Sequence, residues 1–571
     1  MRFKTELQDH QCIPDSEKCC WCSFSALASA LDRQHSLLST PALPIRAPAT
    51  DFTRTMAAPV SIEEFLEPLS VDIDKINRLS QLFLKTFEKL AAGSENQFLP
   101  TPISEAILRP EAKRKQGCHL AIDIGGTNLR VGFVQLGNEA ASSDQANGHI
   151  TNGSEDSSAT RHVRRLLEKS WPIDEHLKNE NPDSLFLWIG KCIAEVVQDG
   201  CDTLHLQSDQ TLPLGVTFSF PMVQHSLSQA TLMQMGKGFA ISPDQDLGDR
   251  LTDGYNRAKS HELPPIRVEA IANDSVSTLV SFIFNFDEAL NRRAAMGLIL
   301  GTGCNATIPL KLSQLNTPKR PKSVVARPEE RVEDVKIAIN TEWSINGTAP
   351  PLHEVGLVSQ WDKTLDIQGE LNGFQPLEFM TAGRYLGELG RIMLVDYLTE
   401  HLGIAAETLP QSLLQQHNLT TTFLSHFRPL RPSALVAMLQ QEFPESTGSP
   451  PFEWTEDLAT AVYRIAKAIE VRAAGIVAAA TLALLTLAEE VPGEGSKAFD
   501  RDYELGVGYT GGCIVHFQDY LQDCQDFLDQ LLRGRFGEAS SLRVVLSPCH
   551  DGGVTGAGIL VAAASQSKAI E

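Results

Sequence analysis

Short apolar runs separated by glycine turns recur along the chain and predict strands, whereas longer runs with helical periodicity predict helices. The clearest pair of runs, residues 120–122 and 129–136, flanks a Gly-Gly turn at residues 125–128 and is typical of a β-hairpin. Backbone N–H groups around such a turn can bind an anion, and Asp123 adds a carboxylate suited to a phosphate-bound Mg²⁺. An ordinary hairpin with a polar tip fits the turn equally well, and the Walker pattern is absent.

The same reading predicts further strands that alternate with helices. Strands are expected at residues 166–173, 214–220, 266–272, 295–300, 337–343 and 542–546, and helices at residues 76–90, 185–197, 251–260, 275–284, 376–400, 458–490 and 556–564. Residues 316–333 are predicted to be a basic loop, and residues 505–515 a strand–turn–strand around Gly511 and Gly512. This alternation indicates α/β domains, and the two glycine turns suggest one structural unit used twice.

The pattern also divides the chain. Residues 1–56 lack periodicity and are predicted to be a disordered extension. Cys19 and Cys22 within it have the spacing of a zinc site, but no second ligand pair follows at a finger-like distance. We expect helices at residues 57–112 packing on a large domain, a small domain at 118–272, the large domain at 273–546, and a turn and helix at 547–571 returning to the small domain.

Composition restricts the partners. With 49 basic and 71 acidic residues among 571, the net charge of −22 disfavours binding to nucleic acid or to anionic membranes. Eleven cysteines form no disulfide framework, and the amino terminus lacks an apolar signal region, so a cytoplasmic protein with reduced thiols is expected. The longest apolar run, residues 473–488, is predicted to be a buried helix rather than a membrane span.

Polar side chains gather where predicted strands end, which is where functional groups usually lie. A sugar ring needs several fixed hydrogen-bond partners, and one carboxylate must accept the proton of a hydroxyl that attacks a phosphoryl group. Each position also has an ordinary interpretation, such as a surface acid or a helix cap, but their order between two phosphate-type turns favours function. The positions are Ser219, Lys237, Asn273, Asp274, Asn305, Glu342 and Glu378.

Several runs resemble motifs of the hexokinase family. In the family's order they are IDIGGTNLRVGFV, TFSFP with KGF, ANDSVS, ILGTGCNA, NTEW and EFMTAGRYLGELGR, and the likeness extends over about residues 60–564. The resemblance implies an α/β, two-lobed actin-like ATPase (ribonuclease H-like) fold with sugar and ATP in a cleft between a small and a large domain. It further implies ATP-dependent phosphorylation of the 6-hydroxyl of a hexose by a monomer or weak homodimer.

The resemblance also assigns roles to residues. Asp274 is expected to be the catalytic base, and the sugar is expected to contact Ser219, Lys237, Asn273, Asn305, Glu342 and Glu378. The phosphates of MgATP are expected to face Asp123, Gly125, Gly126, Thr127, Asn128, Arg130, Thr302, Thr510, Gly511 and Gly512, with Asp551 and Gly552 on the adenosine side. No direct protein ligand to Mg²⁺ is expected, because ATP carries the ion and Asp123 meets it through water.

Departures from the ordinary hexokinase pattern bear on the substrate. Gly236 replaces a threonine before the KGF lysine, Thr510 replaces an aspartate, and Thr555 stands where a basic residue is common. The runs EKSW, FQPLEFMTAGRYLGEL and GYTGG resemble more closely the fungal family members that phosphorylate N-acetylglucosamine. N-acetylglucosamine is therefore the expected substrate, in amino sugar metabolism. A glucose or fructose hexokinase of glycolysis, or a catalytically weak regulatory relative, remain the alternatives.

Overall fold

A computed structural model describes residues 61–570 except 110–116, 139–160, 175, 178–181, 234–244, 287, 288, 290, 370, 429, 430, 445–451, 494, 497–500, 539, 551, 566 and 567. The predicted amino-terminal extension with its cysteines lies outside the described residues, as do Gly236, Lys237 and Asp551.

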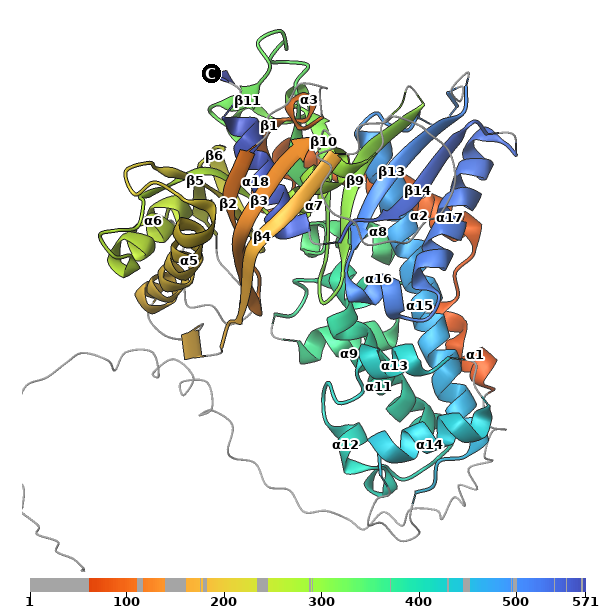
Figure 1. Cartoon of the computed structure of the whole chain (residues 1–571). Coiled ribbons are helices and arrows are strands. Elements are labelled where there is room, and N and C mark those ends of the chain that lie inside the picture. Colours follow the sequence, from red (N-terminus) through yellow and green to blue (C-terminus); the bar gives the residue numbers. More distant parts are fainter. Residues whose placement is uncertain are drawn as a thin grey trace, which may run out of the picture. The chain divides into compact units, whose positions relative to one another are not determined.

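The smaller of the two main sheets has five strands (Figure 1). They are β2 (Gly117–Ile124), β3 (Asn128–Asn138), β4 (Arg161–Pro172), β5 (Leu212–Phe218) and β8 (Ile266–Ala272). Their order is β4-β3-β2-β5-β8, with β2, β3 and β4 antiparallel and β2, β5 and β8 parallel. The predicted hairpin and the predicted strands of this region are therefore confirmed.

Helices cover both faces of the small sheet because its strands are apolar on both sides. Along β2, Leu120 and Ile122 join the core under α5 (Pro182–Leu204) and α6 (Leu247–Ala258), whereas Ala121 joins the core under α18 (Gly552–Ala564). Side chains that alternate between two packed faces have the period of two residues expected for a strand. A separate hairpin, β6 (Met222–Ser226) and β7 (Gln229–Leu232), packs beside α6 and β8.

The larger sheet has eight strands in the order β14-β13-β9-β10-β12-β1-β11-β15. They are β1 (Leu99–Ser104), β9 (Arg292–Leu300), β10 (Cys304–Lys311), β11 (Val324–Ala326), β12 (Lys336–Asn340), β13 (Tyr503–Thr510), β14 (Leu542–Pro548) and β15 (Lys568–Ile570). The predicted loop at 316–333 thus contains the short strand β11, which pairs with β1 and β15. A run this short has no periodicity by which it could be detected.

The five strands β12-β10-β9-β13-β14 repeat the order and directions of the small sheet. The prediction of one unit used twice therefore agrees with the topology, but the second hairpin is β9–β10, around residues 301–303. The predicted strand–turn–strand at 505–515 is wrong, because β13 leads into the helix α16 (Gly512–His516). Gly511, with φ of 121°, turns the chain, and Cys513 and Ile514 are then buried by the helix.

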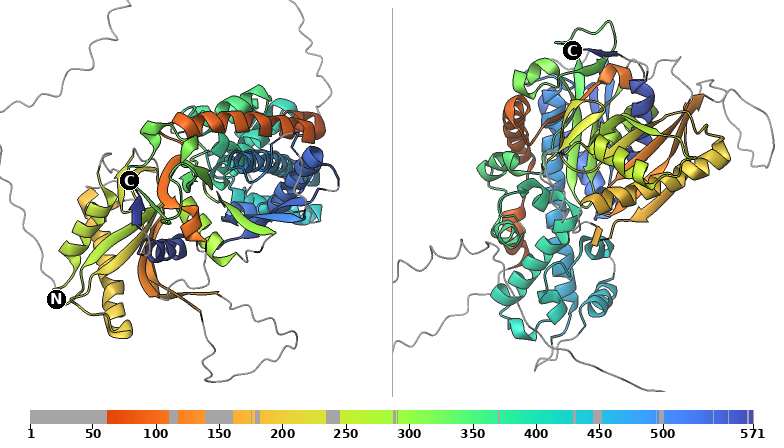
Figure 2. Two further views of the ribbon diagram at one scale, coloured as in Figure 1. Left: turned by 90° about the horizontal axis from the view of Figure 1, so that it is seen from above. Right: turned by 90° about the vertical axis from the view of Figure 1, so that its left-hand side faces the viewer.

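Long helices form the core on one side of the large sheet. α15 (Glu456–Leu487) packs against α2 (Ile73–Gly93), α17 (Tyr520–Phe536) and β10 (Figures 1 and 2). Among the described residues it is the one helix long and apolar enough to cross a membrane, yet 89% of its apolar window is buried in the protein. The prediction of a buried helix at 473–488 is therefore confirmed.

The predicted helix at 376–400 is broken. Ala382 is extended, with φ of −98° and ψ of 145°, between α10 (Pro376–Thr381) and α11 (Gly383–Asp396). The break lets N–H groups of Gly383 and Arg384 bond to the carbonyls of Gly301 and Thr302, at 2.8 and 3.2 Å. The other helices are α1 (Ile62–Leu66), α3 (Glu105–Leu108), α8 (Ala349–Glu354), α9 (Gln360–Gln368), α12 (Gln411–Leu414), α13 (Thr421–His426) and α14 (Pro432–Glu442), with a π-helical turn at Tyr397–His401.

A close helix crossing joins the two sheets. α7 (Asp274–Asn285) packs on β9 and β10 of the large sheet, whereas α18 packs on the small sheet, and the two helices pack against each other. A Cβ on Gly556 would lie 2.2 Å from the carbonyl oxygen of Ser277, so only glycine permits this separation. The Thr217 hydroxyl of β5 donates to the carbonyl of Gly553 at 2.8 Å and lies 2.6 Å from the Ser277 hydroxyl.

A buried acid lies between α15 and α17. The Glu470 side chain is fully buried, and Lys467 Nζ donates to Glu470, Asp519 and Asp523 at 2.7, 2.9 and 2.7 Å. Burial raises the pKa of the Glu470 carboxyl to about 8, because Lys467, shared with two other carboxylates, offsets only part of the desolvation. The stabilising effect of protonated Glu470 is fully present below the carboxyl's unfolded pKa and is lost as the pH rises through its folded pKa.

We therefore predict that Glu470→Gln stabilises the protein more strongly as the pH increases. The free energy of unfolding of the variant, minus that of the wild type, should rise by about 1 kcal/mol per pH unit between roughly pH 5 and 8. Urea denaturation across this range measures it, with Glu456→Gln, an exposed position of the same helix, as the control. A difference for Glu470→Gln that does not change with pH would contradict the prediction.

Candidate active site

Amide side chains form a hydrogen-bonded cluster at the ends of three elements. Asn340 Nδ2 donates to Glu342 Oε1 at 2.8 Å, and Asn305 Nδ2 donates to Asn340 Oδ1 at 2.9 Å. Asn305 Nδ2 also lies 3.5 Å from Glu342 Oε1 and 3.4 Å from Asn273 Oδ1. The predicted sugar contacts Asn273, Asn305 and Glu342 therefore lie together around Asn340, which belongs to the NTEW run but has no predicted role. Glu342 itself lies beyond β12, which ends at Asn340, short of the strand predicted to 343.

The start of α7 places the predicted base next in sequence to two residues that bond within this cluster, Asn273 and Ser275. Asn273 caps the helix, and its Oδ1 accepts from the Ser275 N–H and hydroxyl at 2.9 and 2.7 Å. Asp274 is half-buried, and its Oδ1 accepts from the same N–H at 2.8 Å. The hydrogen bond from the Ser275 N–H therefore fixes the orientation of the Asp274 carboxyl group at the start of the helix.

The other predicted sugar contacts lie on different elements. The N–H of Ser219, just after β5, donates to the carbonyl of Ile124 at 3.0 Å. Glu378 is buried in α10, and its Oε2 lies 3.5 Å from where a Cβ on Gly303 would stand, beside the β9–β10 turn. The carbonyl of Phe218 lies 3.5 Å from Asn273 Nδ2, which connects the Ser219 region to the start of α7. The position of Lys237 remains a prediction.

Asp123 lies at the carboxyl end of β2, against the start of α18. Its Oδ2 is 3.9 Å from Arg130 Nη1, and a Cβ on Gly553 would come within 2.4 Å of it. The turn tip at residues 125–128 is partly to fully exposed, with the Gly125 N–H bonded to the carbonyl of Asn128 at 2.9 Å. Among the described residues, no group of three or more His, Cys, Asp or Glu side chains could hold a metal ion.

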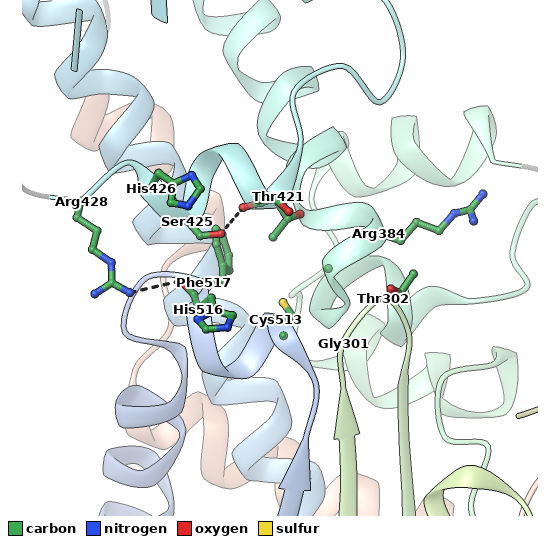
Figure 3. A pocket seen from close by; sticks show the side chains of 13 residues that line it. Gly301, Thr302, Arg384, Thr421, Ser425, His426, Arg428, Cys513, His516 and Phe517 are labelled. Carbon is green, nitrogen blue, oxygen red and sulfur yellow. Dashed lines mark hydrogen bonds between the residues drawn. The ribbon is translucent and has the colours of Figure 1, made fainter. Parts of the chain in front are cut away.

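A pocket of about 750 Å³ opens beside the β9–β10 turn, between α11, α13 and α16 (Figure 3). Its described lining contains two arginines and two histidines but no carboxylate, in a chain whose net charge is −22. The lining residues are Gly301, Thr302, Gly383, Arg384, Thr421, Thr422, Ser425, His426, Arg428, Gly512, Cys513, His516 and Phe517. Basic groups and hydroxyls without an acid suit a ligand that carries negative charge.

The pocket contains some predicted nucleotide residues and omits others. Thr302 and Gly512 line it, and Thr510 and Gly511 directly precede Gly512 in the chain. Gly552 lies elsewhere, since a Cβ on it would be 2.8 Å from Cα of Thr278 in α7. Most of the lining residues were not predicted to belong to a site. Those of α13 reach the pocket only through tertiary packing, and the short sequence of this helix has no glycine turn or charge cluster that would indicate a site.

The pocket thiol is unsuited to nucleophilic attack. Burial raises the pKa of the Cys513 thiol, and burial likewise raises the pKa of Cys304, beside the β9–β10 turn, to about 12. Since the thiolate is the reactive form, both groups are inert near neutral pH. The groups available for chemistry at the site are therefore carboxylates, amides and basic side chains.

Comparison with known proteins identifies what this arrangement resembles. Two family models described as hexokinase match the chain, one at residues 61–284 and the other at residues 295–563. Hexokinase-1 of Schizosaccharomyces pombe is 25% identical over 511 residues, which cover 89% of this chain and 92% of that protein. Hexokinase-5 of Oryza sativa subsp. japonica is 26% identical over 533 residues, which cover 92% and 93% of the two chains.

Solved structures agree on the fold. A hexokinase from Schistosoma mansoni complexed with glucose matches with a TM-score of 0.66 and 24% identity, covering 88% of this chain and 98% of that one. Another hexokinase structure matches with a TM-score of 0.64 and 21% identity, with the same coverage. Together with the repeated five-strand unit, these matches show that the chain has the predicted actin-like ATPase fold.

The turn after β13 provides a test of the site geometry. Alanine at Gly511 would need a φ of 121° and would place its Cβ 2.3 Å from the carbonyl oxygen of Leu300. We predict that Gly511→Ala lowers the free energy of unfolding by roughly 1–3 kcal/mol. Gly512→Ala is the matched control, because its Cβ would approach nothing nearer than His516 Cδ2 at 3.9 Å. If urea denaturation gave the two variants the same free energy of unfolding, Gly511 would not have the positive φ and the close approach to Leu300 on which the prediction rests.

Proposed function

Because the chain belongs to the hexokinase family, we propose that it transfers the terminal phosphoryl group of ATP to the 6-hydroxyl of a hexose. The observation that carries this proposal is the environment of the first turns of α7, which begin with Asp274. Ser275 in those turns bonds to the amide cluster, whereas Ser277 and Thr278 contact the start of α18 beside Asp123. A base between a sugar side and a phosphate side is the arrangement that phosphoryl transfer to a hydroxyl requires.

The amide cluster supplies partners for the sugar. Amide N–H groups of Asn273 and Asn305 can donate to ring hydroxyls, and the carboxylates of Glu342 and Glu378 can accept from them. Ser219 and Lys237 are proposed to contact the same sugar from the other side. Fixed partners of this kind hold the 6-hydroxyl at one position and thereby replace a random encounter by an oriented one.

Asp274 is proposed to act as the general base. As the sugar oxygen forms its bond to the γ-phosphorus, the bond from that phosphorus to the ADP oxygen breaks, and the hydroxyl proton passes to the Asp274 carboxylate. The Ser275 N–H, which donates to Asp274 Oδ1 at 2.8 Å, holds this carboxylate in one orientation before the transfer.

The basic pocket is proposed to hold the nucleotide. Thr302 and Gly512 then lie beside its phosphates, and Arg384 supplies positive charge at that end of the pocket (Figure 3). Mg²⁺, when bound to ATP, neutralises charge that develops on the transferred group. Asp123, at the carboxyl end of β2 and against the start of α18, is proposed to meet that ion through water. The Thr421 hydroxyl, which accepts from the Gly387 N–H at 2.7 Å, can still donate, and the Ser425 hydroxyl, which donates to the Thr421 carbonyl at 2.7 Å, can still accept. Both are proposed to face the ribose and base.

We propose N-acetylglucosamine as the acceptor sugar. Support comes from the EKSW, FQPLEFMTAGRYLGEL and GYTGG runs, which resemble those of fungal N-acetylglucosamine kinases. The curated relatives reported above are named hexokinases, which favours glucose as the second candidate. Small differences in pocket residues can change sugar preference strongly, so family membership leaves both sugars open.

The first prediction of this proposal concerns the base. Asp274→Asn keeps size and polarity but removes the proton acceptor, so kcat should fall by roughly 10²–10⁴. Sugar affinity, measured by calorimetry, should change much less. Asp246→Asn, which alters an aspartate at the start of α6, is the control and should retain full turnover. Near-normal turnover of Asp274→Asn would assign the base to another residue.

The second prediction concerns the substrate. A coupled assay that measures ADP formation should give a higher kcat/KM for N-acetylglucosamine than for glucose. The same preparation is compared on both sugars, so differences in active fraction cancel. A clear preference for glucose would make the protein a glucose hexokinase instead.

A further inference from the structure

Asn340 is the member of the amide cluster that has no predicted role, and it bonds to Glu342, Asn305 and Ser275. Its side chain is 3% exposed at the end of β12. Its Nδ2 donates to Glu342 Oε1 at 2.8 Å, and its Oδ1 accepts from Asn305 Nδ2 at 2.9 Å and lies 3.3 Å from the Ser275 hydroxyl. One buried amide thus touches two proposed sugar contacts and the residue that follows Asp274.

Glu342 needs such support because its backbone is strained. Its φ of 43° lies in the left-handed region, which non-glycine residues adopt at an energetic cost. The N–H of Glu342 lies 3.4 Å from Asn340 Oδ1, and its carbonyl accepts from Gln97 Nε2 at 2.9 Å. Strained conformations persist where the surroundings hold them, and they gather at functional sites.

If Asn340 had a purely structural role, its side chain would need hydrogen-bond partners but no particular partner. A buried amide at a strand end needs partners of any kind, and backbone groups supply them at most such positions. Thr307 is the cross-strand neighbour of Asn340, and its buried hydroxyl is satisfied by the Ser275 hydroxyl, 2.6 Å away. The side chain of Asn340 instead directs its donor to the Glu342 carboxylate, which orients an acid.

We propose that Asn340 is a positioning residue that fixes the Glu342 carboxylate for the sugar and ties it to the first turn of α7. This inference rests on the proposed function, since it assumes that Glu342 contacts the acceptor. Sugar binding at Glu342 is then transmitted through Asn340 and Ser275 to the turn that carries Asp274. The acceptor contacts and the base behave as one hydrogen-bonded unit.

The test compares Asn340→Asp with Asn340→Ser. In Asn340→Asp the acceptor is kept, but the donor to Glu342 becomes a second carboxylate, and two adjacent carboxylates raise the pKa of one of them. Near pH 8 the KM for the sugar should rise about 10- to 100-fold, the factor expected for a lost hydrogen bond to a charged group. The KM for ATP should change by less than about threefold, since Asn340 does not line the nucleotide pocket.

Lowering the pH gives a readout that a structural role would not move. Near pH 6 the carboxyl pair of Asn340→Asp takes up a proton, a donor to Glu342 is restored, and the KM should return towards the wild-type value. Asn340→Ser should show no such recovery. Asp274 and Glu378 are the other carboxyl groups at this end, and their titration could also change the KM with pH. Each KM is therefore divided by the wild-type KM at the same pH. Thr307→Val is the matched control for disturbance of the buried strands.

A double variant keeps the test decisive if Asn340→Asp folds poorly. Glu342→Gln already removes the charged acceptor that Asn340 positions, so adding Asn340→Ser to it should cause little further increase in KM. Additive losses in this cycle, or a pH recovery equally large in Thr307→Val, would overturn the positioning role while leaving the proposed function intact. A wild-type protein that neither turns over nor binds a hexose in calorimetry would overturn both.

Discussion

The close crossing of α7 and α18 is the contact on which the relative placement of Asp274 and Asp123 depends. α7 lies on the large sheet and α18 on the small one, and a glycine at 556 lets their backbones approach to a distance that a side chain would prevent. The hydroxyls of Thr217 and Ser277 satisfy polar groups at this contact. Because Asp274 begins α7 and Asp123 lies against the start of α18, the crossing brings the proposed base and the proposed phosphate-side carboxylate from separate sheets into one region.

The net charge of the chain is strongly negative, but the local charge of the described pocket lining is positive. A chain with a net charge of −22 repels polyanions at long range, yet the described lining of its pocket has two arginines, two histidines and no carboxylate. One buried acid elsewhere, Asp362, is paired with buried Arg472 at 2.6 Å, which joins α9 to α15. The described lining of the pocket therefore favours an anionic ligand, such as the proposed nucleotide, despite the negative net charge of the chain.

The sequence predicts what depends on local pattern. Apolar alternation and a Gly-Gly turn predict the β2–β3 hairpin, and uninterrupted helix formers predict α15. The motifs also lead to the amide cluster, since three of its members were expected to act together. Prediction fails where tertiary contacts decide: Gly511 leads into a helix because of its φ, and Ala382 breaks a helix whose first N–H groups bond to the β9–β10 turn. The α13 side of the pocket and the contacts of Asn340 have no local signature at all.

In the proposed reaction the sugar hydroxyl, and not water, receives the phosphoryl group of ATP. The most direct test is to incubate the protein with MgATP and a hexose and to count ADP and sugar phosphate by mass spectrometry at several times. We expect one hexose 6-phosphate for each ADP formed, and very little ADP when the sugar is omitted. ADP that accumulates without phosphorylated sugar, or the absence of both products with every hexose supplied, would contradict the account.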